Sequence, residues 1–406
     1  MYRVDEQGRP DDLLPHETTV EGDEATDLPA LALAFVFLAY ACLLPFLREY
    51  GTAGLAIPAA CAASMGLIYG RRYLQVSLGL LAAVGAVYIG LSFAGYLHRD
   101  ITLLFDRGAI FQQAFYTLVL VLLVPACAHY HSQVERDAPG WRGLETAILV
   151  LALATKLALG LSGMRLGGLG LGISQLINAD AIAAFIIVRR FGLDPERAGG
   201  LRWFVAALFL LTAGSFQSAI VGVFLVALLL FPNGARGLAT GAIVGLVAVV
   251  LASLPFAREI WWWDFNTGVR LLFWQDVFER FLASDGLGVG FGTETIKPVY
   301  QVGIEEHVIS GLEREGYLNI AAHNAYVDAF YRMGVFGGTV VVLYFATLFA
   351  RTLSPLRAPS AFDCWVASTL ALSLMINVAL ASVAFIFGTG MLAGWLVHRT
   401  TRQSDA

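Results

Sequence analysis

Charged side chains are scarce in this sequence of 406 residues. Asp, Glu, Lys and Arg together make up only 14% of it, whereas hydrophobic residues make up 58%. A soluble domain carries about a quarter charged residues. This scarcity excludes an ordinary soluble protein and indicates an integral membrane protein.

Patterns that hold metals or form disulfides are also missing. Four cysteines lie within or at the ends of apolar runs, with no CxxC or Cys/His spacing: Cys42, Cys61, Cys127 and Cys364. Neither a disulfide framework nor a zinc site is expected, and packing is the default role of these thiols. The sequence has no DxD pair and no other metal-ligand cluster. We expect no metal and no cofactor.

Residues 1–27 lack the basic n-region of a cleaved signal peptide. They contain nine acidic residues against Arg3 and Arg9, which predicts a disordered cytoplasmic tail. The net charge of −5 lies mostly in this tail and in the later 257–322 loop, so nucleic acid is not an expected partner. No repeat of 20–50 residues is present.

Long apolar runs dominate the rest of the chain. A membrane-spanning helix needs roughly 20 apolar residues, and the sequence predicts an all-α fold with about twelve such helices. The clearest cover residues 28–47, 51–69, 73–96, 108–128, 141–161, 236–256 and 323–350. Shorter or less cleanly bounded candidates cover 173–190, 202–215, 217–232, 361–381 and 383–398.

The basic residues predict the orientation, because short cytoplasmic loops are enriched in Lys and Arg. Fifteen arginines fall on the side of the termini: Arg3, Arg9, Arg71, Arg72, Arg136, Arg142, Arg189, Arg190, Arg197, Arg202, Arg236, Arg351, Arg357, Arg399 and Arg402. The short loops on the opposite side contain only four: Arg48, Arg99, Arg107 and Arg165. Tails 1–27 and 399–406 are then cytoplasmic. Loop 257–322, between helices 1–9 (28–256) and helices 10–12 (323–398), faces outward.

The outward loop begins with the aromatic cluster Trp261–Trp263, which is typical of an interfacial anchor and alternatively of stacking against a sugar ring. Helical spacing of apolar residues then predicts an amphipathic helix over Val269–Phe281. Arg270 and Trp274 lie four residues apart on another stripe of this helix. The arginine is either an interfacial cation that meets lipid phosphate or an anion clamp for a ligand.

A glycine-rich segment and a polar helix start complete this region. Glycines alternate over Gly286–Gly292, including Gly288, Gly290 and Gly292, which indicates either a plain tight turn or a close approach of backbone to ligand. After an acidic segment, His323 and Asn324 begin the tenth predicted helix. Residues 324, 328 and 332 share one helix face, so we expect Asn324, Asp328 and Arg332 to line a cavity, with the last two forming an ion pair.

Other polar residues fall in or beside the predicted helices. Lys156 in the fifth is expected to pair with Asp180 in the sixth. Arg165, in the glycine-rich outer segment SGMRLGGLG, is expected to face the same cavity as Asn324, Asp328 and Arg332. Charges at such depth are costly and mark binding sites or pathways.

The motifs described above resemble those of the O-antigen ligase and Wzy-type polysaccharide polymerase superfamily of bacterial membrane glycosyltransferases. The resemblance rests on Arg270 with Trp274, on Gly288-Val-Gly-Phe-Gly292, on His323-Asn324-Ala-Tyr and on Arg332-Met-Gly-Val-Phe-Gly337. A single large outer loop between helices nine and ten also fits the family. Outside roughly 150–350 the likeness is one of topology and composition only.

The resemblance implies transfer of a glycan from a polyprenyl-diphosphate carrier to an acceptor hydroxyl of a glycan or lipid. The reaction would be inverting and metal-independent, at the periplasmic face of the bacterial inner membrane. Arg270 and Arg165 would then stabilise the departing diphosphate, and His323 would act as general base. The implied substrate-binding residues are Arg165, Arg332, Asn324, Asp328, Trp274, Gly288, Gly290 and Gly292.

One position departs from the family pattern. A Ser-Arg pair is common where this chain has Ser215-Phe216-Gln217, so Arg165 or Arg332 would have to supply the second cation. Another class of protein, a flippase for lipid-linked oligosaccharides or a polysaccharide transporter, is also compatible with so apolar a chain. Such transporters tend to show internal repeats and paired broken helices. Because this sequence has no evident repeat and one asymmetric outer loop, it favours the enzyme.

Overall fold

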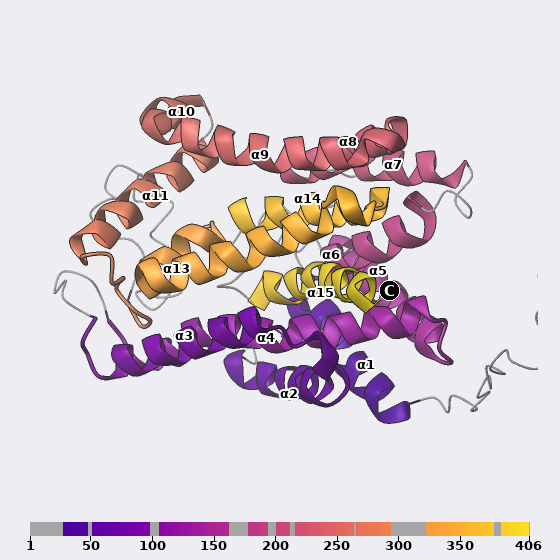
Figure 1. Cartoon of the computed structure of the whole chain (residues 1–406), viewed down its shortest axis with the longest axis horizontal. Helices are drawn as coiled ribbons and strands as arrows, with labels where there is room; N and C mark the ends of the chain where they lie inside the picture. Colours follow the sequence, from indigo (N-terminus) through magenta and orange to yellow (C-terminus); the bar gives the residue numbers. More distant parts are fainter. Residues whose placement is uncertain are drawn as a thin grey trace, which may run out of the picture.

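The computed structural model describes residues 27–47, 51–97, 105–161, 178–193, 200–211, 216–263, 265–293, 322–376 and 383–405. These residues are almost entirely helical (Figure 1). The first half contains α1 (Leu28–Leu47), α2 (Gly51–Ser64), α3 (Val76–Phe93), α4 (Arg107–Glu135), α5 (Trp141–Leu161), α6 (Asn178–Ile187) and α7 (Leu201–Leu211). The second contains α8 (Phe216–Leu230), α9 (Ala235–Ser253), α10 (Ala257–Trp263), α11 (Phe265–Ala283), α13 (Ala325–Thr352), α14 (Ala361–Ile376) and α15 (Val383–Asp405).

The helices coincide with the predicted apolar runs. Four of those described are long and apolar enough to cross a membrane: Val76–Phe93, Arg107–Glu135, Pro232–Ile260 and Ala325–Thr352. Several shorter apolar helices accompany them. The segment Val269–Phe281, predicted as a helix, lies within α11. The Trp261–Trp263 cluster belongs to the short helix α10 and not to an extended loop.

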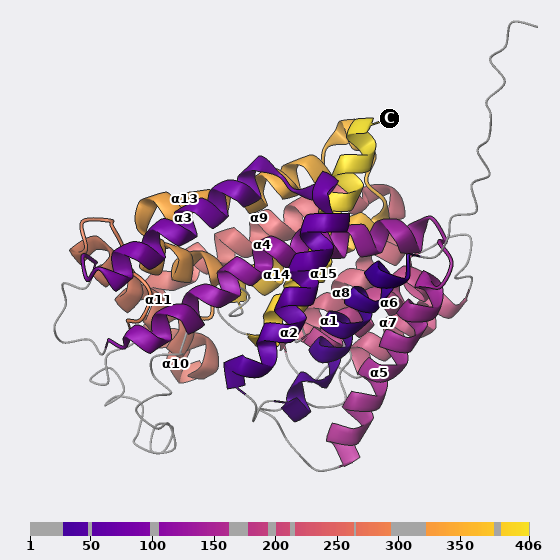
Figure 2. The same ribbon diagram turned by 90° about the horizontal axis from the view of Figure 1, so that it is seen from below.

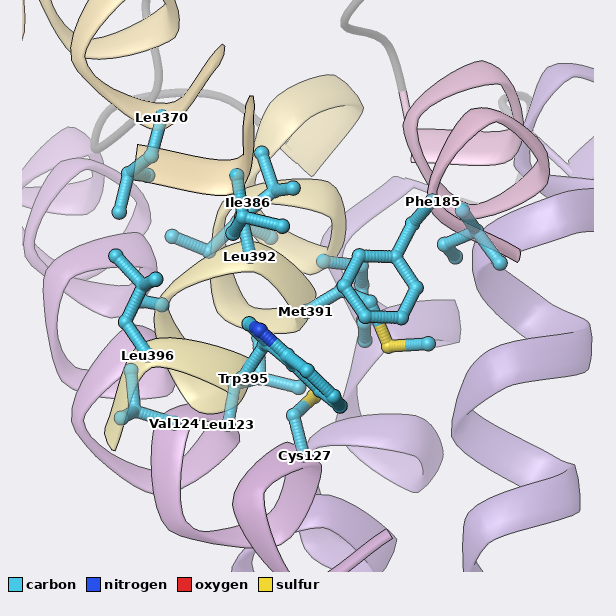
Figure 3. Packing of buried hydrophobic residues seen from close by; sticks show 14 of the residues in the cluster. Leu123, Val124, Cys127, Phe185, Leu370, Ile386, Met391, Leu392, Trp395 and Leu396 are labelled. Carbon is cyan, nitrogen blue, oxygen red and sulfur yellow. The ribbon is translucent and has the colours of Figure 1, made fainter. Parts of the chain in front are cut away.

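The centre of the bundle is the contact between α4 and α15. Figure 3 shows Leu123 and Cys127 of α4 against Met391, Leu392 and Trp395 of α15. Glycines on α15 let the two helices approach closely: a Cβ added to residue 394 would meet the Cβ of Cys127 at 2.5 Å. Small residues at helix–helix contacts are the usual means of close packing between membrane helices.

The other helices are arranged around this pair. α13 and α14 lie between the α3–α4 side and the α8–α9 side of the bundle (Figure 1). α9 is the most peripheral of the long helices, because only 6% of the most apolar part of Pro232–Ile260 is buried within the protein. Figures 1 and 2 both place α10 and α11 at one end of the bundle and the C-terminus towards the other.

Ion pairs gather at the end of the bundle that holds the C-terminus. The buried Glu145 of α5 binds both Arg189 and Arg190, which follow α6. Glu135, the last residue of α4, binds Arg399 at 3.1 Å and is 2.6 Å from His398, both on α15. These bonds continue α15 as helix to Asp405, beyond residue 398, where its apolar run was predicted to end.

Inside the bundle, Lys156 of α5 and Asp180 of α6 form a buried ion pair with Nζ and Oδ1 2.5 Å apart. The two side chains are 11% and 5% exposed. This confirms the pairing predicted from the sequence. A buried charge is tolerated in apolar surroundings only when it is paired, so this bond ties α5 to α6.

Candidate functional site

The segment before α13 holds His323 in an unusual backbone conformation. Its φ is +53°, in the left-handed region that β-carbon-bearing residues rarely adopt. Asn324 follows as the N-cap of α13, and its Oδ1 accepts hydrogen bonds from the backbone N–H groups of Tyr326 (3.0 Å) and Val327 (3.1 Å). Asparagine is a preferred N-cap because its side chain satisfies such orphan donors. The cap therefore fixes the place where α13 begins.

On the other side of His323, the carbonyl of Ala322 accepts a hydrogen bond from the indole N–H of Trp274 on α11. Ala322 is fully buried, and Trp274 is 5% exposed. Both belong to a small apolar cluster beneath α11: Ala257, Leu271, Trp274, Val277, Val289, Ala322 and Tyr331. The segment that carries His323 is thus held by α11.

Arg270 lies one turn before Trp274 on α11, near enough to His323 for its charge to act on the imidazole. Its Nη1 donates to the carbonyl oxygen of Ile376, the last residue of α14, at 3.0 Å. Helix C-termini favour such cations because their last carbonyls lack partners within the helix. Burial, and after it the positive charge of Arg270, lowers the pKa of the His323 imidazole to about 4. The imidazole is therefore neutral at neutral pH, and it is a weaker base than an ordinary histidine.

Further along α13, Asp328 and Arg332 form the predicted ion pair, with Oδ2 and Nε 3.4 Å apart. Both are buried, at 6% and 3% exposure. The arginine also donates through Nη1 to Oε1 of Gln113 on α4 (2.6 Å) and to the carbonyl of Thr293 (3.2 Å). Arg332 thus binds α13 to α4 and to the end of the glycine-rich segment.

A small cavity lies between α4 and α13 at this pair. It is lined by Gln113, Thr117, Phe291, Ala325, Asp328, Ala329, Arg332 and Met333. The centre of a water molecule can occupy a volume of about 10 Å³ in this cavity. The cavity therefore has room for about one water molecule. Oδ1 of Asp328 is buried, and among the described residues it has no hydrogen-bond partner. The cavity therefore presents an acceptor beside a cation.

α13 is broken directly after this pair. Met333 and Gly334 leave the helical conformation, and Gly334 has φ +59° and ψ −164°. The break exposes the carbonyls of Tyr331 and Arg332, which accept from the N–H groups of Val289 (2.8 Å) and Gly290 (3.0 Å). No pattern within α13 predicts this break, because its bonding partners come from a segment about forty residues earlier.

The glycine-rich segment is packed closely against neighbouring helices. A Cβ on Gly288 would meet the backbone of α13, one on Gly290 would meet Oγ of Ser92 on α3, and one on Gly292 would meet Ile110 of α4. The close approach predicted for these glycines exists, and it is an approach to neighbouring helices. Their assignment to substrate binding stays a prediction.

Several parts of the predicted site lie outside the described residues. These are Arg165, the Gly214-Ser215 position of the family's Ser-Arg pair, and the acidic segment 294–315. The structure does bring together Arg270, Trp274 and His323 at one place and Asp328 with Arg332 at the next turn of α13.

Sequence reasoning missed two contributors to the site. Gln113 and Thr117 are polar residues four apart in the apolar run of α4, so they share a helix face, and this spacing was the available signal. The second is the buried pair Asp276–Arg280 of α11, with Oδ2 and Nε 2.8 Å apart. Among the described residues, no group of three His, Cys, Asp or Glu side chains is arranged to hold a metal ion.

Comparison with protein-family models finds no match to this chain, and no curated protein sequence matches it. The functional assignment therefore depends on the residues described above.

Proposed function

We propose that the protein is an integral membrane glycosyltransferase, a polysaccharide polymerase or an O-antigen-type ligase. It would transfer a glycan from a polyprenyl-diphosphate carrier to a hydroxyl of a glycan or lipid acceptor. The observation that carries this proposal is that Arg270 is near enough to His323 for its positive charge to act on the imidazole. A cation held at the end of α14 and a neutral imidazole together suit a reaction that releases a diphosphate and takes up a proton.

The step assigns one role to each residue. The acceptor oxygen attacks the anomeric carbon, and the bond between that carbon and the diphosphate oxygen breaks with inversion. The hydroxyl proton passes to His323, and the electron pair leaves with the diphosphate, whose charge Arg270 stabilises. Asp328 and Arg332 order the adjoining cavity, where the buried carboxylate and guanidinium offer an acceptor and a donor to a hydroxyl group or a water.

The placement in the membrane belongs to the same proposal. We assign twelve membrane-crossing helices, α1–α9 and α13–α15, with α10, α11 and the rest of 257–322 outside. The arginine-rich end of the bundle would lie in the cytoplasm with both termini, following the positive-inside rule. The cavity at Asp328 and Arg332 is lined by Gln113 and Thr117 in the first half of α4, a helix of 29 residues and so about 43 Å long that ends at Glu135. The site would therefore face the periplasm of a bacterial inner membrane, in contact with membrane lipids.

The test is glycan transfer by purified protein in lipid nanodiscs, with a polyprenyl-diphosphate-linked oligosaccharide as donor. The acceptor is either a second lipid-linked unit or a lipid-core glycan. His323→Ala and Arg270→Ala should each lose transfer by about 100-fold or more, in the range seen when a general base or an electrostatic donor is removed. Arg258→Ala, which removes an exposed arginine from α10, is the matched control and should transfer normally. Full transfer by both site variants would overturn the mechanism. In liposomes, net movement of the lipid-linked donor across the bilayer without bond formation would assign the protein to the flippases.

A further inference from the structure

Trp274 and the peptide that precedes His323 are joined by a buried hydrogen bond. The indole N–H donates to the carbonyl of Ala322, and both residues lie in the apolar cluster beneath α11. Loss of a donor to a buried carbonyl costs free energy, because the buried oxygen has already given up its contact with water. The bond therefore fixes the peptide plane between residues 322 and 323.

His323 needs this restraint because its backbone is strained. A left-handed φ at a residue other than glycine persists only when the surrounding structure enforces it. On the C-terminal side, the capping hydrogen bonds of Asn324 fix the start of α13. On the N-terminal side, the bond from Trp274 fixes Ala322. The imidazole is thus directed by two anchors, one on each side of a strained residue.

The ring of Trp274 is not placed to stack on a sugar. Its residue is 5% exposed, and Leu271, Val277 and Tyr331 belong to the cluster around it. The only polar atom of the indole is used by Ala322. The tryptophan therefore acts on the site through the backbone and not through its aromatic face.

We infer that Trp274 is the positioning residue for His323. By holding the Ala322 carbonyl, it keeps the imidazole beside Arg270 in the geometry needed to accept the proton of the acceptor. This inference rests on the proposed function for its chemistry, but the positioning itself can be measured without turnover. A displacement of about 1 Å at a reacting group can cost 100-fold in rate.

The decisive variant is Trp274→Phe, which keeps an aromatic ring in the cluster and removes only the N–H donor. We expect kcat for glycan transfer to fall by about 10- to 100-fold, while KM for the lipid-linked donor changes by less than about twofold. We also expect diethyl pyrocarbonate to modify the His323 imidazole faster in this variant. Mass spectrometry of the peptide that contains His323 measures the rate of modification. Trp203→Phe on α7, far from α11, makes the same chemical change and should alter neither quantity.

The second anchor gives an independent variant in case Trp274→Phe does not accumulate. Asn324→Ala removes the cap and should speed modification of the His323 imidazole, as Trp274→Phe does. A wild-type modification rate in Asn324→Ala would contradict the two-anchor arrangement.

The outcomes separate this inference from the proposed function. If His323→Ala is inactive but Trp274→Phe keeps the wild-type kcat and modification rate, the positioning role is wrong and the glycosyltransferase stands. If His323→Ala transfers normally, the proposed role of the histidine is wrong. The modification rate of His323 in Trp274→Phe then still decides whether the tryptophan holds it.

Discussion

Gly288 and Gly334 lie backbone against backbone where α13 breaks. A Cβ on Gly288 would come within 2.5 Å of the amide nitrogen of Gly334, and a Cβ on Gly334 would come within 2.5 Å of the carbonyl oxygen of Gly286. Both glycines also have positive φ, +79° and +59°. The break in the helix and the glycine-rich segment therefore require each other.

Gly288→Ala should destabilise the protein by about 2–4 kcal/mol, because it adds both backbone strain and a collision with main-chain atoms that cannot move aside. Thermal unfolding in detergent measures this loss. Gly241→Ala on α9 is the control, since a Cβ there meets nothing within 4 Å and the residue is in a regular helix. That variant should be neutral or slightly more stable. A Gly288→Ala protein as stable as Gly241→Ala would show that the contact does not matter.

Arg332→Met should be strongly destabilising, by about 3–5 kcal/mol, because it leaves the buried carboxylate of Asp328 without its cation. The double variant Asp328→Asn with Arg332→Met removes that uncompensated charge and should recover part of the stability. Unfolding of the two single variants and the double variant gives the coupling between the residues directly. Strictly additive losses would mean that the two side chains do not stabilise each other.

The buried ion pair of Lys156 and Asp180, which joins α5 to α6, should respond to substitution as the Asp328–Arg332 pair does. Lys156→Met and Asp180→Asn should each lower the yield of folded protein, and the double variant Lys156→Leu with Asp180→Leu should recover much of it. Asp137→Asn serves as control, since Asp137 pairs with Arg142 at a position where both side chains are more than half exposed. Loss of an exposed pair costs about 1 kcal/mol or less. If Asp137→Asn lowers the yield of folded protein as much as the buried variants do, burial of an unpaired charge is not the cause of their loss.

The imidazole of His323 should stay neutral to unusually low pH. Burial and Arg270 lower its pKa to about 4, so between pH 4 and 6.5 it remains reactive where an ordinary histidine is protonated. The rate of its modification by diethyl pyrocarbonate should therefore fall only near pH 4. Arg270→Gln removes the neighbouring charge and should move this midpoint upward, towards 6.5. A wild-type midpoint near 6.5, or no shift in the variant, would contradict the described environment.

Much of the helical framework follows from the sequence, because long apolar runs fold as helices whatever their neighbours are. The pair Asp328–Arg332 also follows, since it depends only on spacing within one helix. The Lys156–Asp180 pair could be predicted because a buried charge must find an opposite one, and few are available in so apolar a chain.

The site itself could be predicted only in part. His323 and Arg270 stand out as residue types, but the strained φ of His323 depends on Trp274 and Asn324 together. The break at Gly334 depends on donors from Val289 and Gly290, and Arg332 finds Gln113 across 219 residues of sequence. Such long-range contacts carry no periodic signal.

The peripheral position of α9 has a consequence for how the chain can vary. Most of its surface meets no other part of the protein, and its glycines at 237, 241 and 245 have open space where a side chain would stand. In a membrane, these positions of α9 should tolerate almost any apolar side chain. At residue 394, by contrast, the neighbouring Cys127 leaves no room for even one added carbon. Random apolar substitutions should therefore accumulate freely along α9 while α15 stays unchanged at its contact with α4.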